Sequence, residues 1–382
     1  MVRRTPLIIM TLSLLLLSPL IYMLLIPSPS YTRRAALLGH LSNHSGLETW
    51  KIDYLMWFVT AFHLLQSKEL LPREEVLLNL QSHRVNGLFA YFIEEYPQVS
   101  DAYYVVSTLS ILGELDLINV TEYARWLGGL QEEDGGILNG YGVYMGWSPR
   151  ATAYSTCWAL LALKTLGRLD VVNVTRALDW LFNYCYNMTD GSFRPYPSYN
   201  GTALYGHYYG DPNLIFTTSL VVRTLCELDE IERLNITKTT DFFLTYYDTT
   251  SGAFSTYSDD LSRGNIEITF EALSALASMG TLEVIDWEKT INFILEEQKP
   301  NGAFSHQNYR NYRVDAKALK ALQLLNALDR LEEPFPCFYY YILRRRLLAW
   351  RGILVAIGVA VPPFALFISL RLKRWKEESL TR

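Results

Sequence analysis

Hydrophobic positions recur along the chain in a repeated two-part pattern. A short amphipathic segment leads into a glycine turn, and a loop then leads into a second, more apolar segment. In the second segments the apolar residues are spaced by three and four positions, as Trp158, Leu161, Ala162 and Leu166 show, which predicts helices. These helices are expected at 50–66, 101–113, 153–167, 214–228, 266–279 and 313–328. No stretch alternates cleanly enough to predict a sheet.

The glycine turn occurs six times. The six copies are Gly46-Leu47, Gly87-Leu88-Phe89, Gly136-Ile137, Gly191-Ser192-Phe193, Gly252-Ala253-Phe254 and Gly302-Ala303-Phe304. Six helical hairpins in a row predict either a stacked solenoid or a closed ring. The ring is favoured because the more apolar helices need cover on all sides, and because neither terminal repeat has the polar face of a cap.

Two uncharged apolar runs near the ends of the sequence are long enough to cross a bilayer. They are Leu7 to Ile26 and Gly352 to Leu370, and at about 1.5 Å per residue each crosses a hydrocarbon core of roughly 30 Å. We expect the first run to be an uncleaved anchor, because no small-x-small cleavage site follows it; a cleaved signal peptide is the alternative. The predicted parts are a cytoplasmic tail (1–6), a span (7–26), a linker (27–33), the helical ring (34–331), a linker (332–351), a span (352–370) and a basic cytoplasmic tail (371–382).

The charge and glycosylation patterns predict where the middle of the chain lies. Residues 27–343 hold a clear excess of acidic over basic residues, which repels nucleic acid and anionic membrane surfaces. The same stretch holds six N-x-Ser/Thr sequons, at Asn43, Asn119, Asn173, Asn187, Asn200 and Asn235. Such sites are glycosylated only outside the cytoplasm. We therefore expect residues 27–343 to be extracytoplasmic and both termini cytoplasmic, although basic residues flank both spans on both sides.

Some of these residues also have a plainer structural explanation. Asn119, Asn173 and Asn235 each precede a helical pattern, where asparagine is a favoured N-cap. Four cysteines are too few for a disulfide framework in 382 residues. Cys157, Cys185 and Cys226 fall within helical patterns and are expected to be small buried residues. The alternative is one disulfide outside the cell between two of the four cysteines, which include Cys337.

The repeated motif resembles that of prenyltransferases and squalene cyclases. It reads W-L-x-x-x-Q, then D/N-G-G/A-F/I, then A-L-x-A-L, and its best copies are Trp126 to Ile137 with Thr156 to Leu163, and Phe293 to Phe304 with Ala316 to Leu322. The resemblance covers residues 34–331 and implies an α6/α6 barrel, in which the helix after each glycine turn is the inner one. The expected fold class is therefore all-α: an α6/α6 toroid flanked by two transmembrane helices.

This ring topology predicts a ligand site at one end. All six glycine loops lie at the same end, which we call the mouth, and both membrane spans attach at the opposite end. The mouth loops combine aromatic residues with arginine, which suits sugars, acidic glycans or a protein loop. The candidate ligand-binding residues are Tyr144, Trp147, Arg150, Arg194, Tyr205, His207, Tyr208, Asp259, Asp260, Arg263, Tyr309 and Arg313.

The zinc chemistry that the resemblance implies for protein prenyltransferases is not expected here. Those enzymes hold zinc with Asp, Cys and His at the starts of inner helices. The sequence has no D-x-C at these starts, and Ser155 stands where a histidine would. Asp315 and His306 stand alone, so we expect neither a metal nor another cofactor.

Two other enzyme chemistries also lack a full set of residues. Squalene cyclases use a D-x-D-D acid, whereas Tyr257 replaces the first aspartate here and leaves Asp259 and Asp260 as an exposed pair. Helical toroids also host polysaccharide lyases, an analogy at the level of the fold. The lyase candidates are His207 and Tyr208 with Arg194 or Arg263.

The sequence thus favours a non-catalytic role. We expect a membrane-anchored ectodomain that binds a ligand, a glycan or a partner protein at its mouth, as a subunit of a cell-envelope assembly and without nucleic acid. The alternative is an enzyme of the toroid superfamily, of the prenyltransferase, terpene cyclase or polysaccharide lyase type.

Overall fold

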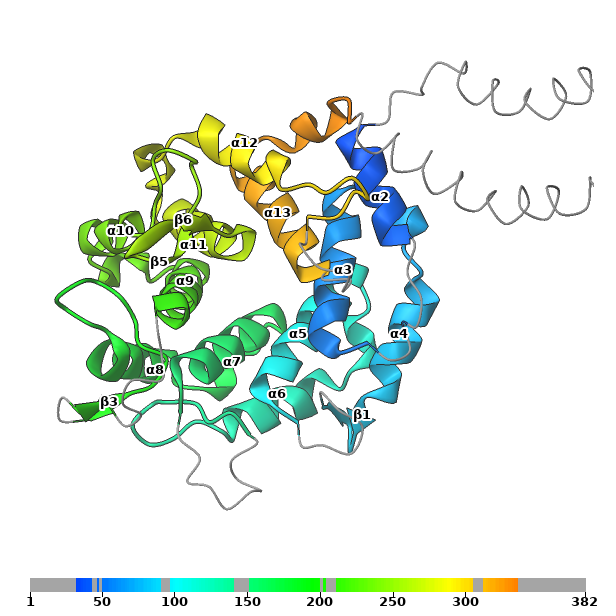
Figure 1. Cartoon of the computed structure of the whole chain (residues 1–382). Helices are drawn as coiled ribbons and strands as arrows, with labels where there is room; N and C mark the ends of the chain where they lie inside the picture. Colours follow the sequence, from blue (N-terminus) through cyan, green and yellow to red (C-terminus); the bar gives the residue numbers. More distant parts are fainter. Residues whose placement is uncertain are drawn as a thin grey trace, which may run out of the picture. The chain divides into compact units, whose positions relative to one another are not determined.

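The computed structural model describes residues 32–42, 47, 50–90, 97–140, 151–199, 202–203, 211–304 and 312–335. The chain divides into two compact units. One comprises Met1–Leu37, Pro300–Gly302 and Glu332–Arg382, and the other comprises Leu38–Lys299 and Ala303–Leu331. The second unit contains the ring of helices (Figure 1).

Six helices form the inner layer of this unit. They are α3 (Ile52–Leu64), α5 (Val99–Leu112), α7 (Ala153–Thr165), α9 (Asp211–Glu227), α11 (Ile266–Met279) and α13 (Tyr312–Leu324). Each packs on the next in sequence order, and α13 returns to pack on α3. The inner layer is therefore a closed ring, which Figure 1 shows along its axis. The predicted ring is confirmed, and the predicted inner helices match to within a few residues.

The remaining helices alternate with the inner ones along the chain. They are α2 (Arg33–Ser42), which spans both units, α4 (Arg73–Ser82), α6 (Val120–Gly128), α8 (Val174–Trp180), α10 (Ile236–Leu244) and α12 (Trp287–Glu296). A short 3-10 helix links each inner helix to the next outer helix, as η2 (Lys68–Leu70) does between α3 and α4. Each link follows the C-terminal end of an inner helix, whereas the turns at Gly87, Gly136, Gly191 and Gly252 each precede the N-terminal end of one, so links and turns belong to opposite ends of the inner helices.

The fold is mostly helical but not all-α, which corrects the expectation that no sheet would form. Three antiparallel hairpins stand between outer and inner helices: β1 (Arg84–Val85) with β2 (Leu88–Phe89), β3 (Ser198–Tyr199) with β4 (Thr202–Ala203), and β5 (Ser255–Tyr257) with β6 (Asp260–Gly264). With strands of two to five residues, these hairpins are too short for an alternating pattern to be visible in the sequence.

The glycine turns fasten each hairpin to the next one. Gly252 has φ +77°, and a Cβ there would lie 2.5 Å from the backbone of Lys289 and Thr290 in α12. The Thr290 hydroxyl donates a hydrogen bond of 2.7 Å to the Gly252 carbonyl. Gly191 repeats this arrangement against Thr239 of α10. Glycine recurs with the repeat because the turn needs both a left-handed backbone and room for the neighbouring helix.

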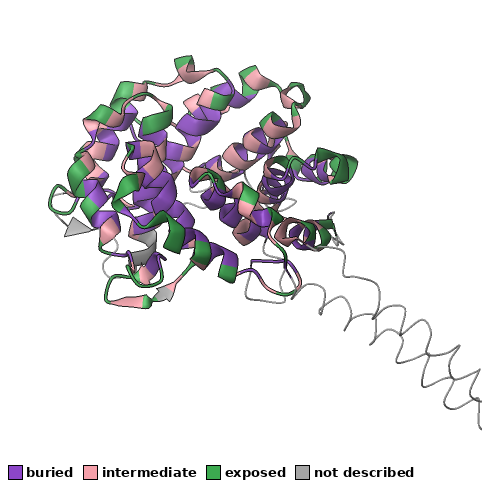
Figure 2. Ribbon diagram, turned by 90° about the horizontal axis from the view of Figure 1, so that it is seen from above, coloured by how far each residue is buried: buried purple, intermediate pink, exposed green. Residues whose placement is uncertain are grey.

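The hydrophobic core lies between the two layers of helices. Outer helices bury one stripe each, such as Tyr123 and Leu127 of α6 and Phe243 of α10. Inner helices bury most of their length, and α11 hides nearly all of its residues. Figure 2 shows the buried positions concentrated on the inner helices and the exposed ones on the outer surface. This explains why the second helix of each repeat is the more apolar one.

Within the described residues, no helix has the length and apolar character that a bilayer crossing needs. The spans predicted at 7–26 and 352–370 lie outside the described residues.

Candidate functional site

The structure describes five of the twelve predicted mouth residues. Asp259 and Asp260 lie at the turn of the β5–β6 hairpin, and the Ser262 hydroxyl donates to Asp260 Oδ1 at 2.6 Å. Arg194 is exposed, whereas Arg313 belongs to the inner helix α13. Arg263 is in β6. The other seven candidates, Tyr144, Trp147, Arg150, Tyr205, His207, Tyr208 and Tyr309, lie outside the described residues.

Charged side chains meet in the middle of the ring. Arg313, Lys317 and Lys320 are spaced by four and three residues on α13, so they share one face of that helix. Glu267 and Glu271 are four apart on α11. Arg313 Nε lies 2.6 Å from Glu267 Oε1, and Lys317 Nζ lies 2.8 Å from Glu271 Oε1. The two neighbouring inner helices are therefore joined by a ladder of ion pairs.

The Lys317 ammonium shows that this ladder lies in the ring interior. Its Nζ is 4.8 Å from the ring centroid of Phe216, 5.5 Å from that of Trp57 and 5.7 Å from that of Phe270. These aromatic side chains belong to α9, α3 and α11. Only a side chain inside the ring of helices can contact all three helices. Lys317 is 3% exposed, and cation–π contacts of this kind are strongest when desolvated.

Glu271 is the anion that balances Lys317. Burial alone would raise the pKa of its carboxyl, but the charges of Lys317 and Arg223 and hydrogen bonds from Lys317 and Ser219 outweigh burial and lower the pKa. The Ser219 hydroxyl lies 3.1 Å from Glu271 Oε2. Glu271 is therefore ionised at neutral pH and is a structural anion, not a proton donor.

Two further cations of the interior lack such a partner. In the described part of the chain, no carboxylate lies within ion-pair distance of Arg223 or Lys320. Burial would lower the pKa of Arg223, but Tyr103 and nearby glutamates raise it, so the guanidinium stays charged. Burial and the charge of Arg223 lower the pKa of Lys320 to about 8. Perturbed cations of this kind gather at binding and catalytic sites more often than elsewhere.

Aromatic residues continue the interior on the side of α5 and α7. Trp158 stacks on Tyr154 at 5.4 Å and tilts against Tyr104 at 6.1 Å, measured between ring centroids. All three keep partial access to solvent, although protein surrounds Tyr104 closely enough for burial to raise the pKa of its hydroxyl well above the usual range. Solvent therefore reaches aromatic surface inside the ring.

Asp53, at the start of α3, adds an acid to this surface. Burial raises the pKa of its carboxyl, although Arg313 acts against this shift. Its Oδ1 atom is buried and accepts no hydrogen bond from a described residue. We call the following residues the interior cluster: Asp53, Trp57, Tyr104, Trp158, Phe216, Arg223, Glu267, Phe270, Glu271, Arg313, Lys317 and Lys320.

A zinc site of the prenyltransferase type does not fit the start of α7. The Ser155 hydroxyl donates to the Ile137 carbonyl at 2.6 Å and closes a capping box with Thr152. Burial raises the pKa of the Cys157 thiol to about 12, whereas a zinc ligand must be a thiolate. The described residues contain no group of three or more His, Cys, Asp or Glu side chains placed to hold a metal.

Two single-residue expectations need correction. Asp315 does not stand alone: it is fully buried, and its Oδ2 lies 3.3 Å from Nε2 of His40. Cys226 is exposed, because it lies at the end of α9 on the side turned away from the core, whereas Cys157 and Cys185 are buried as expected. His306 and Cys337 lie outside the described residues.

Four of the predicted glycosylation sites are described. Asn119, Asn173 and Asn235 are exposed N-caps of α6, α8 and α10, and each accepts a backbone N–H with Oδ1. Asn187 lies in the turn before Gly191 and bonds to Asp190 at 2.9 Å. Capping uses only Oδ1, so the Nδ2 atom that would carry a glycan stays available in the three caps. Asn43 and Asn200 lie outside the described residues.

Most of the interior cluster escaped the sequence analysis, which identified only Arg313. A signal was nevertheless present. Charges at spacing four or three interrupt the apolar helices α11 and α13, namely Glu267 with Glu271 and Lys317 with Lys320. Charged residues in otherwise buried helices are rare unless they are paired or functional.

Comparisons with known proteins support the fold. The family described as "Prenyltransferase alpha-alpha toroid domain" matches residues 30–145 and 148–346. A structure of the type II terpene cyclase MstE from Scytonema with geranylgeranyl dihydroxybenzoate has a TM-score of 0.55 and 14% identity, over 78% of this chain and 97% of that one. Protein geranylgeranyltransferase-I from Candida albicans, complexed with GGPP, has a TM-score of 0.58 and 15% identity, over 73% and 85%. A search among curated protein sequences finds no significant match. At these identities the structural likeness establishes the fold.

Proposed function

The chain belongs to the prenyltransferase alpha-alpha toroid family, and from this premise we propose that the interior of its ring binds an isoprenoid ligand with an acidic end group. One observation supports this most directly. Solvent-accessible aromatic surface and two cations without a carboxylate partner share the same interior. The apolar part of an amphiphilic anion would cover the aromatic surface, and its charged end would pair with the two cations.

The aromatic surface suits the hydrocarbon part of such a ligand. Trp57, Tyr104, Trp158 and Phe216 present broad faces with partial solvent access, and burying such faces against branched hydrocarbon is favourable. Two solved structures with this fold contain such a ligand: geranylgeranyl dihydroxybenzoate in the terpene cyclase and GGPP in the geranylgeranyltransferase. That shared feature is the reason for choosing an isoprenoid among apolar ligands.

The cations suit the acidic end. Arg223 donates in a planar fork that matches a carboxylate or a phosphate, and Lys320 adds a second positive charge nearby. Lys317 does not serve this purpose, because Glu271 already pairs with it. The end group is therefore expected on the α9 side of the interior, near Arg223.

A catalytic role is the second candidate, and Asp53 is the observation that favours it. Burial raises the pKa of its carboxyl, which favours the protonated acid, and Tyr104 lies close enough to respond to its charge. An acid beside aromatic faces could protonate an alkene of the ligand. The solved relatives named above are enzymes, which supports this candidate more than the non-catalytic role that the sequence favoured.

The test uses the purified full-length chain in a non-ionic detergent. Geranylgeranyl phosphate, geranylgeraniol and octadecyl phosphate are titrated while tryptophan fluorescence is recorded. We expect the phosphate of the isoprenoid to bind at least tenfold more tightly than the alcohol, and Arg223→Gln to abolish this difference, whereas Lys238→Gln, at an exposed position of the outer helix α10, has no effect. Equal binding of all three ligands, or none, would reject the proposal.

The same samples decide between binding and catalysis. After long incubation, mass spectrometry and chromatography separate unchanged ligand from an isomer or a transfer product. A product that disappears in Asp53→Asn, with binding retained, establishes the catalytic candidate. If the ligand is unchanged at every pH, the ring binds it without catalysing a reaction.

We further propose that the chain is anchored through residues 7–26 and 352–370, with residues 27–343 outside the cytoplasm. The two apolar runs and the six sequons support this placement. Protease added to sealed spheroplasts should then degrade the ring, and an endoglycosidase should lower its mass. A protected, unglycosylated ring would reject the placement. A protein partner or glycan at the mouth remains a prediction, which co-purification from native membranes would test.

A further inference from the structure

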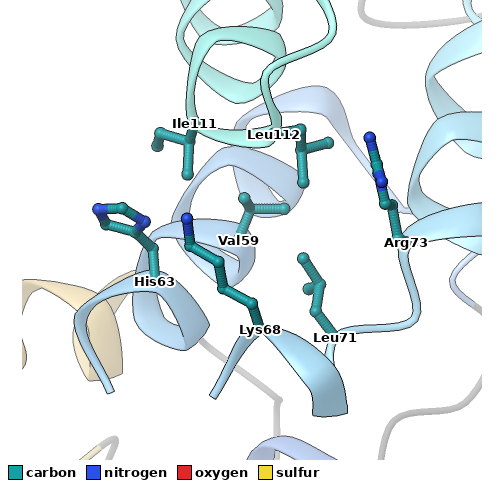
Figure 3. A pocket seen from close by; sticks show the side chains of 7 residues that line it. All are labelled: Val59, His63, Lys68, Leu71, Arg73, Ile111 and Leu112. Atoms are coloured by element: carbon teal, nitrogen blue, oxygen red, sulfur yellow. The ribbon is translucent and has the colours of Figure 1, made fainter. Parts of the chain in front are cut away.

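A small pocket lies at the end of the ring opposite the glycine turns. It is enclosed by the last turns of α3 and α5, by η2 and by the first residue of α4, and its volume is about 160 Å³. Figure 3 shows the lining residues, which are Val59, His63, Lys68, Leu71, Arg73, Ile111 and Leu112. The pocket sits between the inner and outer layers and shares no lining residue with the interior cluster.

The lining divides into an apolar floor and a cationic rim. Val59, Leu71, Ile111 and Leu112 supply the floor, and the three remaining residues carry nitrogen groups. Figure 3 shows Lys68 extending beside the His63 ring, with Arg73 across the pocket from them. No carboxylate lines the pocket. This division matches an anion that carries a short hydrocarbon group.

The three cations of the rim are exposed. Arg73 is the first residue of α4, where the helix dipole disfavours positive charge, and Lys68 begins the three-residue turn η2. Arg73 does pair with Glu114, but more than half of its side chain stays exposed. The side chains of His63 and Lys68 have no hydrogen-bond or ion-pair partner within the described part of the chain.

Crowding of like charges is evident at His63. Burial lowers the pKa of its imidazole, and the nearby charges of Lys68 and Lys320 lower it further. Arg73, which also lines the pocket, has the same sign and pairs with Glu114. An anion in the pocket would relieve this repulsion.

Size decides the class of anion. A volume of about 160 Å³ is smaller than sites for drug-sized molecules, which start at about 300 Å³. We propose that this pocket binds an alkyl phosphate group, with the phosphate between His63, Lys68 and Arg73 and its first carbons on Val59, Leu71 and Leu112. Arginine and lysine together favour a phosphate over a carboxylate, because a phosphate has oxygens for both.

Such a group has two sources, a phospholipid head group or a soluble phosphate monoester. The phosphate chemistry itself does not depend on the anchoring or on the ligand of the ring interior.

The experiment is calorimetric titration of the full-length chain in a non-ionic detergent at pH 7. The probes are n-butyl phosphate, inorganic phosphate and n-butanol. We expect n-butyl phosphate to bind at least tenfold more tightly than either of the others, because only it uses both the rim and the floor. Dihexanoylphosphatidic acid and glycerol 3-phosphate then compete with it: the stronger competitor identifies the source.

Two variants make the test specific. Lys68→Gln should weaken n-butyl phosphate binding about tenfold while leaving the thermal midpoint unchanged, since Lys68 has no structural partner. Lys238→Gln, an exposed lysine on α10, is the matched control and should bind like the wild type. Absence of n-butyl phosphate binding at millimolar concentration, or equal binding by wild type and Lys68→Gln, would overturn the proposal.

Discussion

The backbone N–H of Phe304 donates a hydrogen bond of 2.7 Å to Oδ1 of Asp315, eleven residues further along the chain. This bond ties the last glycine turn to the inner helix that follows it. Earlier repeats make the same link with threonine: Phe254 to Thr269 at 3.0 Å, Phe193 to Thr218 at 2.9 Å and Ile137 to Thr156 at 3.1 Å. The acceptor is buried in every case. The repeat therefore conserves a hydrogen bond as well as a glycine.

Removing one of these acceptors should destabilise the ring. Thr269→Val keeps the shape of the side chain but leaves the Phe254 N–H without an acceptor in the core. We expect a loss of about 1–3 kcal/mol in the free energy of unfolding. Thr269→Ser retains the hydroxyl and should lose clearly less. Denaturant unfolding followed by circular dichroism measures both variants, and equal losses would show that the methyl group, not the hydrogen bond, matters.

The sequence was sufficient to predict the ring of helices but not the side chains that meet in its interior. Glycine turns, helical spacing and apolar second helices repeat along the chain, so each copy reinforces the same prediction. The interior depends instead on which helices face each other across a closed ring. Lys317 meets Phe216 from about a hundred positions earlier in the sequence, and no local pattern connects the two. The hairpins were missed because strands of two to five residues are too short to show a period.

The Lys317–Glu271 pair should behave as a unit. Glu271→Gln removes the nearer of the two carboxylates beside the buried Lys317 ammonium and leaves Glu267 at 3.7 Å as its anion, so we expect a cost of about 3 kcal/mol, at the lower end of the range for breaking a buried pair. The double variant Lys317→Met with Glu271→Met should recover most of that loss, because methionine fills the space among Trp57 and Phe270 without a charge. Equilibrium unfolding of the full set completes a double-mutant cycle. A double variant as unstable as the sum of the two single variants would contradict the pairing.

Gly252 and Gly113 have nearly the same backbone conformation, so substitutions at the two positions separate the cost of backbone strain from the cost of steric crowding. Gly252 has φ +77° and a neighbouring backbone 2.5 Å from its missing Cβ, whereas Gly113 has φ +73° and nothing within 4 Å. Gly113→Ala should cost only the conformational strain, about 1–2 kcal/mol. Gly252→Ala should cost about 3–5 kcal/mol, because α12 must also move. Thermal unfolding midpoints compare the two variants. Similar shifts would mean that the turn at Gly252 can move to accommodate a methyl group.

Asn173 should have two separable roles. Its Oδ1 accepts the Arg176 N–H at 3.0 Å and caps α8. In protein made without glycosylation, Asn173→Ala should lose about 1 kcal/mol and Asn173→Asp almost nothing, since aspartate is an equally good cap. When the protein is produced in a host that glycosylates such sites, the intact mass of both variants should be lower than that of the wild type by one glycan. An unchanged mass in the host would show that this sequon serves only as a cap.

Lys320 should make stability depend on pH in a definite direction. The pKa of its amine is about 8 in the folded chain and about 10.4 in an unfolded one. Between these values the unfolded chain binds more protons, so stability contributed by this group rises with pH across that window. Below about pH 8 the folded protein holds a charged ammonium near Arg223, and this cost is fully present there.

Lys320→Met removes the cost and therefore tests its origin. The variant should be more stable than the wild type at pH 7, by at most about 3 kcal/mol at about 1.4 kcal/mol per pKa unit, and the advantage should shrink toward pH 10. Lys238→Met on α10 controls for the titration of exposed lysines. An advantage of equal size at both pH values would assign the gain to hydrophobic packing. An advantage that fades with pH, combined with weaker binding of geranylgeranyl phosphate, would show that the strained ammonium is kept for the ligand.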